Sequence, residues 1–203
     1  MQHFWRLLKH LDIPHATLLD LDLGRKGGGF GRVKTVIEKL IEFGVPRATL
    51  LKVEGGVLSG TDFAALHSWQ GTEDREILPG WVDSLRPHGV YFSAPLDLDL
   101  AMLDAFPDAY KAIIPAGGGP KMAAEKAAEV VLGTAGPGMA LYTGTFENYP
   151  ALLPAYRYHF LTHSKPATHL AALTHIKKMD LAEKMPSVLA EVLQHIAKSL
   201  RRG

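Results

Sequence analysis

Apolar positions along the first half of the chain follow two different spacings. In some stretches they recur every three or four residues, which is typical of one face of a helix, and in others they form short unbroken runs, which are typical of buried strands. In chain order, these stretches predict a helix at 2–12, a strand at 15–22, a helix at 33–41, a strand at 48–53, a short helix at 63–67 and a strand at 89–93. Helices that alternate with strands favour an α/β fold, in which a mostly parallel sheet is flanked by helices.

The second half of the chain shows helical spacing alone. Proline and glycine interrupt the chain after residue 106, and the apolar residues beyond that point predict helices over residues 121–131, 149–162, 167–178 and 187–200. We therefore predict an α/β core over residues 1–106 and a mainly helical C-terminal region over residues 107–203.

Composition adds limits on the class of protein. Hydrophobic residues make up 47% and charged residues 21% of the 203 residues, which is typical of a soluble globular protein. Cysteine is absent, which excludes disulfides, thiolate metal sites and a cysteine nucleophile. Apolar runs fall short of the roughly 20 residues that a membrane span needs, and the first residues do not resemble a signal peptide. We therefore expect a cytoplasmic protein without a membrane partner.

Two aspartates one position apart follow the first predicted strand. Side chains alternate between the faces of a strand, so Asp20 and Asp22 are expected on one face and the neighbouring leucines on the other. Carboxylates this close repel each other unless a metal ion, a shared proton or a basic side chain compensates. Because ligands of α/β proteins bind beyond the carboxyl ends of strands, the pair predicts a site for a hard divalent ion such as Mg²⁺.

A second acidic pair, Asp97 and Asp99, follows the predicted strand at 89–93. If the two strands are neighbours in a parallel sheet, both pairs emerge at the same edge, and four carboxylates can surround one or two cations. Other roles stay open: Asp97 suits the cap of a helix that begins near Leu98, and Asp22 suits the anchor of the following turn.

Basic residues offer candidate partners for phosphate. Lys165 precedes Pro166 at a predicted helix start, where a lysine does not serve the helix dipole and is free to face a phosphate or an acidic site. A glycine-rich loop at residues 27–31 separates the first strand from its helix and is flanked by Arg25, Lys26, Arg32 and Lys34. Residues 163–203 carry seven Lys or Arg, Lys177 and Lys178 among them, against three acids. We predict that these two lysines and the four basic residues beside the loop bind the backbone of DNA. His169 is expected on a helix surface.

Three segments together resemble a known family. The strand and loop at residues 18–31, the segment Tyr-Phe-Ser-Ala-Pro-Leu-Asp-Leu-Asp at residues 91–99 and the Ser-Lys-Pro helix entry at residues 164–166 are similar to the C-terminal Toprim nuclease region of OLD-family (overcoming lysogenization defect) ATP-dependent endonucleases. The resemblance implies a Toprim-like sheet and cleavage of DNA with Mg²⁺ or Mn²⁺, two ions in an intact site. It assigns metal binding to Asp20 and Asp22 and to Asp99 or Asp97, and a catalytic role to Lys165.

The chain also departs from that family. A Toprim domain opens with a strand that ends in a metal-binding glutamate, and this sequence starts at the helix that would follow it. The ATPase region of the family has no counterpart here, so we expect a fragment, a gene with a misassigned start or a degenerate relative. By resemblance an ATPase domain or subunit is an expected partner beside DNA, and homodimerisation is left open.

Two other functions fit the same residues. Haloacid-dehalogenase-like phosphatases also begin with a strand and Asp-x-Asp, and they use Mg²⁺ and a distant lysine, which would make Asp20 the nucleophile. That family usually has Thr or Val two residues after the second aspartate, where this chain has Gly24. The third alternative is a Toprim-like scaffold that binds DNA or a protein without catalysis.

Overall fold

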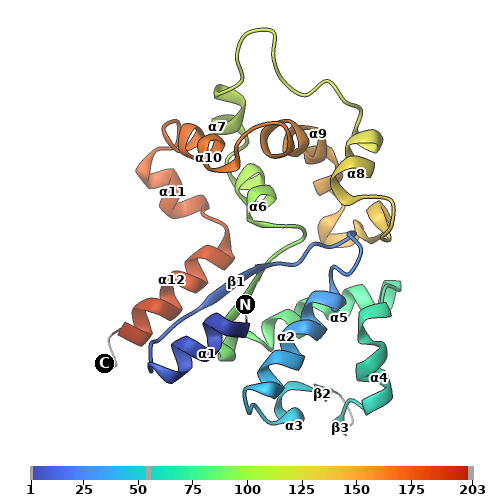
Figure 1. Ribbon diagram of the computed structural model, residues 1–203. Helices are drawn as coiled ribbons and strands as arrows, with labels where there is room; N and C mark the ends of the chain where they lie inside the picture. The colour runs from blue at the N-terminus through green and yellow to red at the C-terminus, as the bar shows by residue number, and fades with distance from the viewer. Residues whose placement is uncertain (1, 54–55, 201–203) are drawn as a thin grey trace.

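The computed structural model describes residues 2–53 and 56–200, and it shows an α/β body joined to a larger helical part (Figure 1). The elements of the body are α1 (Gln2–His10), β1 (Thr17–Asp20), α2 (Phe30–Glu42), α3 (Arg47–Leu50), β2 (Lys52–Val53), β3 (Gly56–Val57), α4 (Gly60–Ala65), η1 (Leu66–Ser68), α5 (Thr72–Asp83), η2 (Arg86–His88) and β4 (Val90–Ser93). The elements that follow are α6 (Leu98–Ala105), α7 (Pro107–Ala112), α8 (Ala124–Leu132), η3 (Gly138–Leu141), η4 (Gly144–Phe146), η5 (Tyr149–Leu152), α9 (Leu153–Tyr156), the π-helix η6 (Arg157–Leu161), α10 (Lys165–Leu173), α11 (Lys178–Lys184) and α12 (Ser187–Leu200).

A short parallel sheet lies at the centre of the body. β1 pairs with β4 in parallel, with Thr17 opposite Val90 and Asp20 opposite Ser93. Parallel strands need a crossover, and the segment from α2 to η2 provides it. All four residues of β4 are buried, whereas β1 is only partly covered. Within the described ranges the sheet holds these two strands, and β2 and β3 form a separate antiparallel hairpin.

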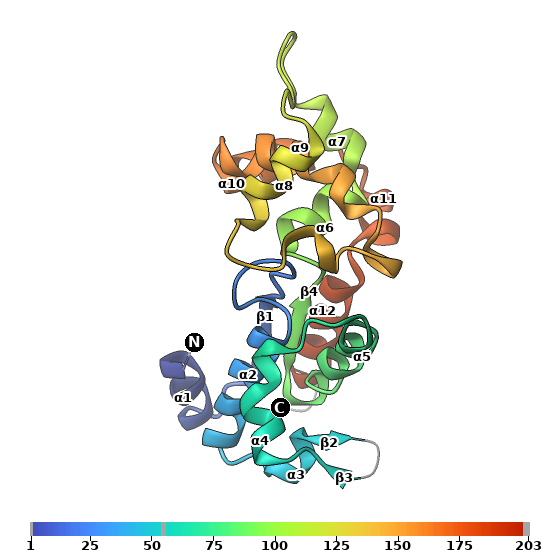
Figure 2. The same cartoon turned by 90° about the vertical axis from the view of Figure 1, so that its right-hand side faces the viewer.

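Buried apolar side chains form one cluster in the body and another in the helical part. The first includes Val33 and Ile37 of α2 and Val90 and Phe92 of β4. The second gathers side chains from α6 to α10, and along the chain it begins at Leu96. α12 then returns to the body and packs on β4, so the helical part is attached at both ends (Figure 2). The predicted domain boundary at residue 106 stays a prediction.

The coarse prediction of an α/β fold with a mainly helical second half is confirmed. The helix predicted over 187–200 has those limits in the structure, and the strand predicted over 89–93 is β4. The more specific prediction of a Toprim sheet stays a prediction. Along the described residues, no helix is long and apolar enough to cross a membrane.

Other local predictions were wrong. The strand predicted over 15–22 spans only β1, because the backbone leaves the extended conformation before Asp22. The strand predicted over 48–53 is mostly a helical turn after Pro46, α3, and only its last two residues pair, in the β2–β3 hairpin. The prediction also missed α5, whose sequence contains Pro79 and Gly80.

Candidate functional site

The chain turns sharply after β1. Asp22 has a left-handed backbone with φ of 53°, which Asp tolerates better than most residues. The amide of Asp22 donates to the Leu96 carbonyl at 2.7 Å, and the amide of Leu23 donates to the Pro95 carbonyl at 2.9 Å. The segment after β1 is therefore hydrogen-bonded to the segment after β4. Asp20 is the last residue of β1, and Asp22, Asp97 and Asp99 lie beyond the carboxyl ends of the two strands.

Asp20 and Asp22 do not share a face. Asp20 ends β1, is exposed and accepts a hydrogen bond from Ser93 Oγ at 3.2 Å. Asp22 is only 5% exposed, and its carboxylate is taken by two arginines: Arg25 Nη1 lies 2.6 Å from Oδ1, and Arg32 forms an ion pair with Oδ2. The expectation of two carboxylates on one strand face is wrong, because the left-handed turn places Asp22 outside the strand.

Arg25 links this turn to the helical part. Its Nε donates to the Val131 carbonyl of α8 at 3.0 Å, and its Nη1 lies 3.9 Å from Asp97 Oδ2. Arg25 was expected only as a DNA contact, and the structure shows that it also ties Asp22 to the second acidic pair.

Asp97 has the capping role that the sequence left open. Its Oδ1 accepts the amide of Leu100 at 3.0 Å at the start of α6, and its Oδ2 accepts the hydroxyl of Tyr156 from α9. The side chain is 4% exposed. Burial raises the pKa of this carboxyl above its usual value, against the opposing effect of those two hydrogen bonds.

Asp99 meets the two side chains that α10 presents one turn apart. Lys165 Nζ forms an ion pair with Asp99 Oδ2, and His169 Nε2 lies 2.8 Å from Oδ1. On the other side of the imidazole, Tyr110 Oη of α7 lies 2.6 Å from Nδ1. Burial alone would raise the pKa of Asp99, but the hydrogen bonds from His169 and Lys165 outweigh it and hold the pKa below its usual value.

The placement of His169 differs from the expected helix surface, because its ring is inside this network. Its spacing of four residues from Lys165 was a usable signal, since residues at that spacing share one helix face. Tyr110 and Tyr156 gave no signal in the sequence, because their hydroxyls meet His169 and Asp97, which are distant along the chain.

The other predicted basic residues lie apart from these ion pairs. Lys26 is exposed in the loop after β1, and Lys177 and Lys178 are exposed where α11 begins. Lys34 Nζ donates to the Ala64 carbonyl at 2.8 Å, so it is tied to α4. Contact with DNA stays a prediction for all of them.

The glycine-rich loop folds against itself. The amide of Gly28 donates to the Arg25 carbonyl at 3.0 Å, and the amide of Gly29 donates to the Leu21 carbonyl at 2.7 Å. A Cβ on Gly28 would lie 1.8 Å from the Asp22 carbonyl oxygen, so the turn requires glycine there. Because these amides are used within the loop, they are not available to cradle a phosphate.

The carboxylates do not fit a preformed metal centre. Over residues 2–53 and 56–200, no group of three or more His, Asp or Glu side chains is placed to hold an ion. The buried acids instead engage cations and hydroxyls of the chain itself: arginines at Asp22, Tyr156 at Asp97, and Lys165 with His169 at Asp99. An ion could bind only after some of these partners had moved.

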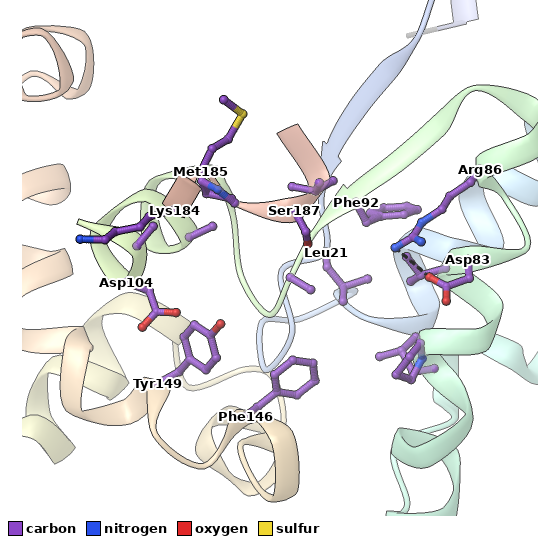
Figure 3. A pocket seen from close by; sticks show the side chains of 18 residues that line it. Leu21, Asp83, Arg86, Phe92, Asp104, Phe146, Tyr149, Lys184, Met185 and Ser187 are labelled. Atoms are coloured by element: carbon purple, nitrogen blue, oxygen red, sulfur yellow. Dashed lines mark ion pairs between the residues drawn. The ribbon is translucent and has the colours of Figure 1, made fainter. Parts of the chain in front are cut away.

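A cavity of about 470 Å³ lies nearby but has different chemistry (Figure 3). Leu21, Phe92 and Phe146 give it apolar walls, and the labelled charged side chains include Arg86, whose Nη2 pairs with Asp83 at 3.0 Å. Burial, with Asp104 adding to it, raises the pKa of its Tyr149 to about 12. Neither acidic pair lines this cavity, and Lys165 does not line it either. The candidate site is therefore the ionic network and not this cavity.

Comparison with models of protein families, with curated proteins and with solved structures gave no match to this chain.

Proposed function

We propose that the chain is a Toprim-like endonuclease that nicks DNA with low sequence specificity and with Mg²⁺ or Mn²⁺. One observation carries the proposal: Lys165 and the two acidic pairs, which come from three separate parts of the sequence, lie at the carboxyl ends of two parallel strands. This end of the sheet is where α/β proteins place their reacting groups.

The basic side chains supply the features that phosphodiester cleavage needs. In hydrolysis, a water oxygen attacks phosphorus, the bond to the leaving oxygen breaks, and negative charge grows on the phosphorane. The Lys165 side chain is 46% exposed, so its ammonium can approach a phosphate while Asp99 holds it. Arg32, half exposed beside Asp22, can contact a neighbouring phosphate of the DNA backbone. Contacts of this kind read phosphate and not bases, which supports low sequence specificity.

The requirement for a divalent ion is part of the proposal. Carboxylate oxygens are the preferred ligands of Mg²⁺, and four of the chain's carboxyl groups lie near the ends of β1 and β4. Because these groups already have partners, ion binding requires an exchange in which an arginine leaves Asp22.

Nicking of supercoiled plasmid DNA with Mg²⁺ or Mn²⁺ tests the proposal. We expect the wild type to nick, Lys165→Ala to lose about a hundredfold in rate, and Asp22→Asn to be inactive. Asparagine is the better probe at position 22, because it also tolerates the left-handed backbone. Lys126→Ala, which breaks an exposed ion pair with Glu129, is the matched control and should keep full activity. A wild type that nicks with neither ion contradicts the proposal, as does full activity in Lys165→Ala.

Two observations favour other functions. Asp20 is exposed at the end of β1, which supports a phosphatase with Asp20 as its nucleophile, and a fluoroberyllate adduct at Asp20 would favour that function. The ion pairs that neutralise Asp22 and Asp99 favour a binding module without catalysis. DNA binding that is independent of metal, with no cleavage, would support the module.

A further inference from the structure

The Asp99 carboxylate is held at both oxygens by one helix. Lys165 and His169 lie four residues apart on α10 and reach Oδ2 and Oδ1 respectively. Asp99 lies in the first turn of α6, which is fixed by its Asp97 cap. His169 occupies Oδ1 of Asp99, so only Oδ2 is left for Lys165. The position of the Lys165 ammonium therefore depends on His169.

In a neutral imidazole, the hydrogen-bond chain requires one tautomer. An ionised carboxylate only accepts hydrogen bonds, so Nε2 of His169 must carry the proton that it donates to Asp99. In the neutral ring Nδ1 is then an acceptor, and the hydroxyl of Tyr110 donates to it at 2.6 Å. Burial raises the pKa of Tyr110, so that its hydroxyl keeps its proton and remains a donor.

The ring plane is also fixed. Phe160 stacks on His169 with ring centroids 5.0 Å apart and an angle of 28° between the planes. Tyr110 meets the same ring edge to face at 5.9 Å. A side chain held by stacking on one side and by hydrogen bonds at both nitrogens has little freedom to move, and it can transmit a defined position to its partners.

We propose that His169 is a positioning residue: held as its Nε2–H tautomer by Asp99 and Tyr110 together, it restricts Lys165 to one oxygen of Asp99 and thereby sets the place of the ammonium beside the scissile phosphate. This role rests on the proposed nuclease function. It acts through Lys165 and involves no contact between His169 and DNA.

Substitutions that differ only in the reach of their donor test the role in the nicking assay. We expect His169→Ala to lower kcat about ten- to a hundredfold with KM changed less than twofold, because a displacement of about 1 Å has effects of this size. Glutamine carries an amide nitrogen near the place of Nε2 and should restore most of the rate, whereas asparagine, whose amide corresponds to Nδ1, should not. His175→Gln, at an exposed histidine just after α10, is the control. Wild-type kcat in His169→Ala, or no rescue by glutamine, overturns the proposal.

Nitrogen NMR of the imidazole at pH 8 gives a readout that does not depend on cleavage. We expect the His169 signals of the wild type to show a protonated Nε2 and an unprotonated Nδ1 that accepts a hydrogen bond. Tyr110→Phe should keep Nε2 protonated, because Asp99 still accepts from it, and should shift the Nδ1 signal through the loss of its donor. A protonated Nδ1 in the wild type, or no change in Tyr110→Phe, overturns the proposal. If the wild type does not nick DNA, the proposed function fails, and the NMR result alone decides whether Tyr110 holds His169 as described.

Discussion

Gly28 gives a sharp test of the turn that carries Asp22. In Gly28→Ala the new Cβ would lie 1.8 Å from the Asp22 carbonyl oxygen, 2.6 Å from its carbon and 3.2 Å from the Arg25 carbonyl oxygen. All three atoms belong to the backbone, so no side chain can rotate out of the way, and the turn must open by about 1 Å or more. Overpacking of this kind destabilises proteins by about 1–3 kcal/mol, and we expect the upper end, about 3 kcal/mol, because the hydrogen bonds of the turn are strained as well. For a domain of this size the melting temperature should fall by about 6–12 °C.

Urea unfolding followed by circular dichroism measures the change, with Gly31→Ala as the matched control. A Cβ on Gly31 meets nothing within 4 Å, and the residue lies in the first turn of α2, so alanine there should be neutral or stabilise by up to about 1 kcal/mol. The two variants add the same methyl group three positions apart. If Gly28→Ala unfolds within about 1 kcal/mol of the wild type, the close approach of the loop to Asp22, and with it the geometry of the site, is refuted.

Two further predictions concern buried polar groups. Tyr156→Phe removes the hydroxyl that Asp97 accepts and should lower the free energy of unfolding by about 1.5–3 kcal/mol, with a smaller loss when Asp97→Asn is present; an unchanged urea midpoint would contradict the contact. Burial, followed by the charge of His163, lowers the pKa of His159 to about 4 from 6.5, and the side chain is 3% exposed. The unfolded state then binds more protons between these values, so stability should fall by about 2–3 kcal/mol as the pH drops from 6.5 to 4; His159→Gln should remove this part of the pH dependence, and an equal dependence in both proteins would contradict it.

The elements that the sequence predicts well are those whose pattern depends on one packing partner. In α12 one apolar stripe recurs over fourteen residues, and both predicted limits are correct. The wrong strand at 48–53 shows the limit of this approach: Leu50 and Leu51 are buried, as a strand would require, but a short apolar run also fits a helical turn, and Pro46 starts one. α5 was missed because Pro79 and Gly80 are unfavourable inside a helix, and tertiary packing overrides them.

The site was predictable as a set of charges but not as a set of contacts. The Asp-x-Asp pattern and the strand positions were enough to bring both pairs to one end of the sheet. The left-handed backbone of Asp22, which separates it from Asp20, depends on hydrogen bonds to Leu96 and Pro95 that no local pattern reveals. The tyrosine partners come from α7 and α9, and nothing in the spacing of residues relates a buried tyrosine to an acid 59 positions away.

The parallel pairing of β1 and β4 also has a consequence for how the chain folds. Asp20 and Ser93, opposite each other in the ladder, are 73 positions apart, so pairing closes a long loop at an entropic cost of roughly 4 kcal/mol beyond the constant term. Long-range pairing of this kind is slow and becomes favourable only when the intervening helices already supply packed surface. We therefore expect α2 and α5 to form before the strands meet. The acidic pairs come together only when that late step is complete, so the proposed site should be absent from any partly folded intermediate that lacks the sheet.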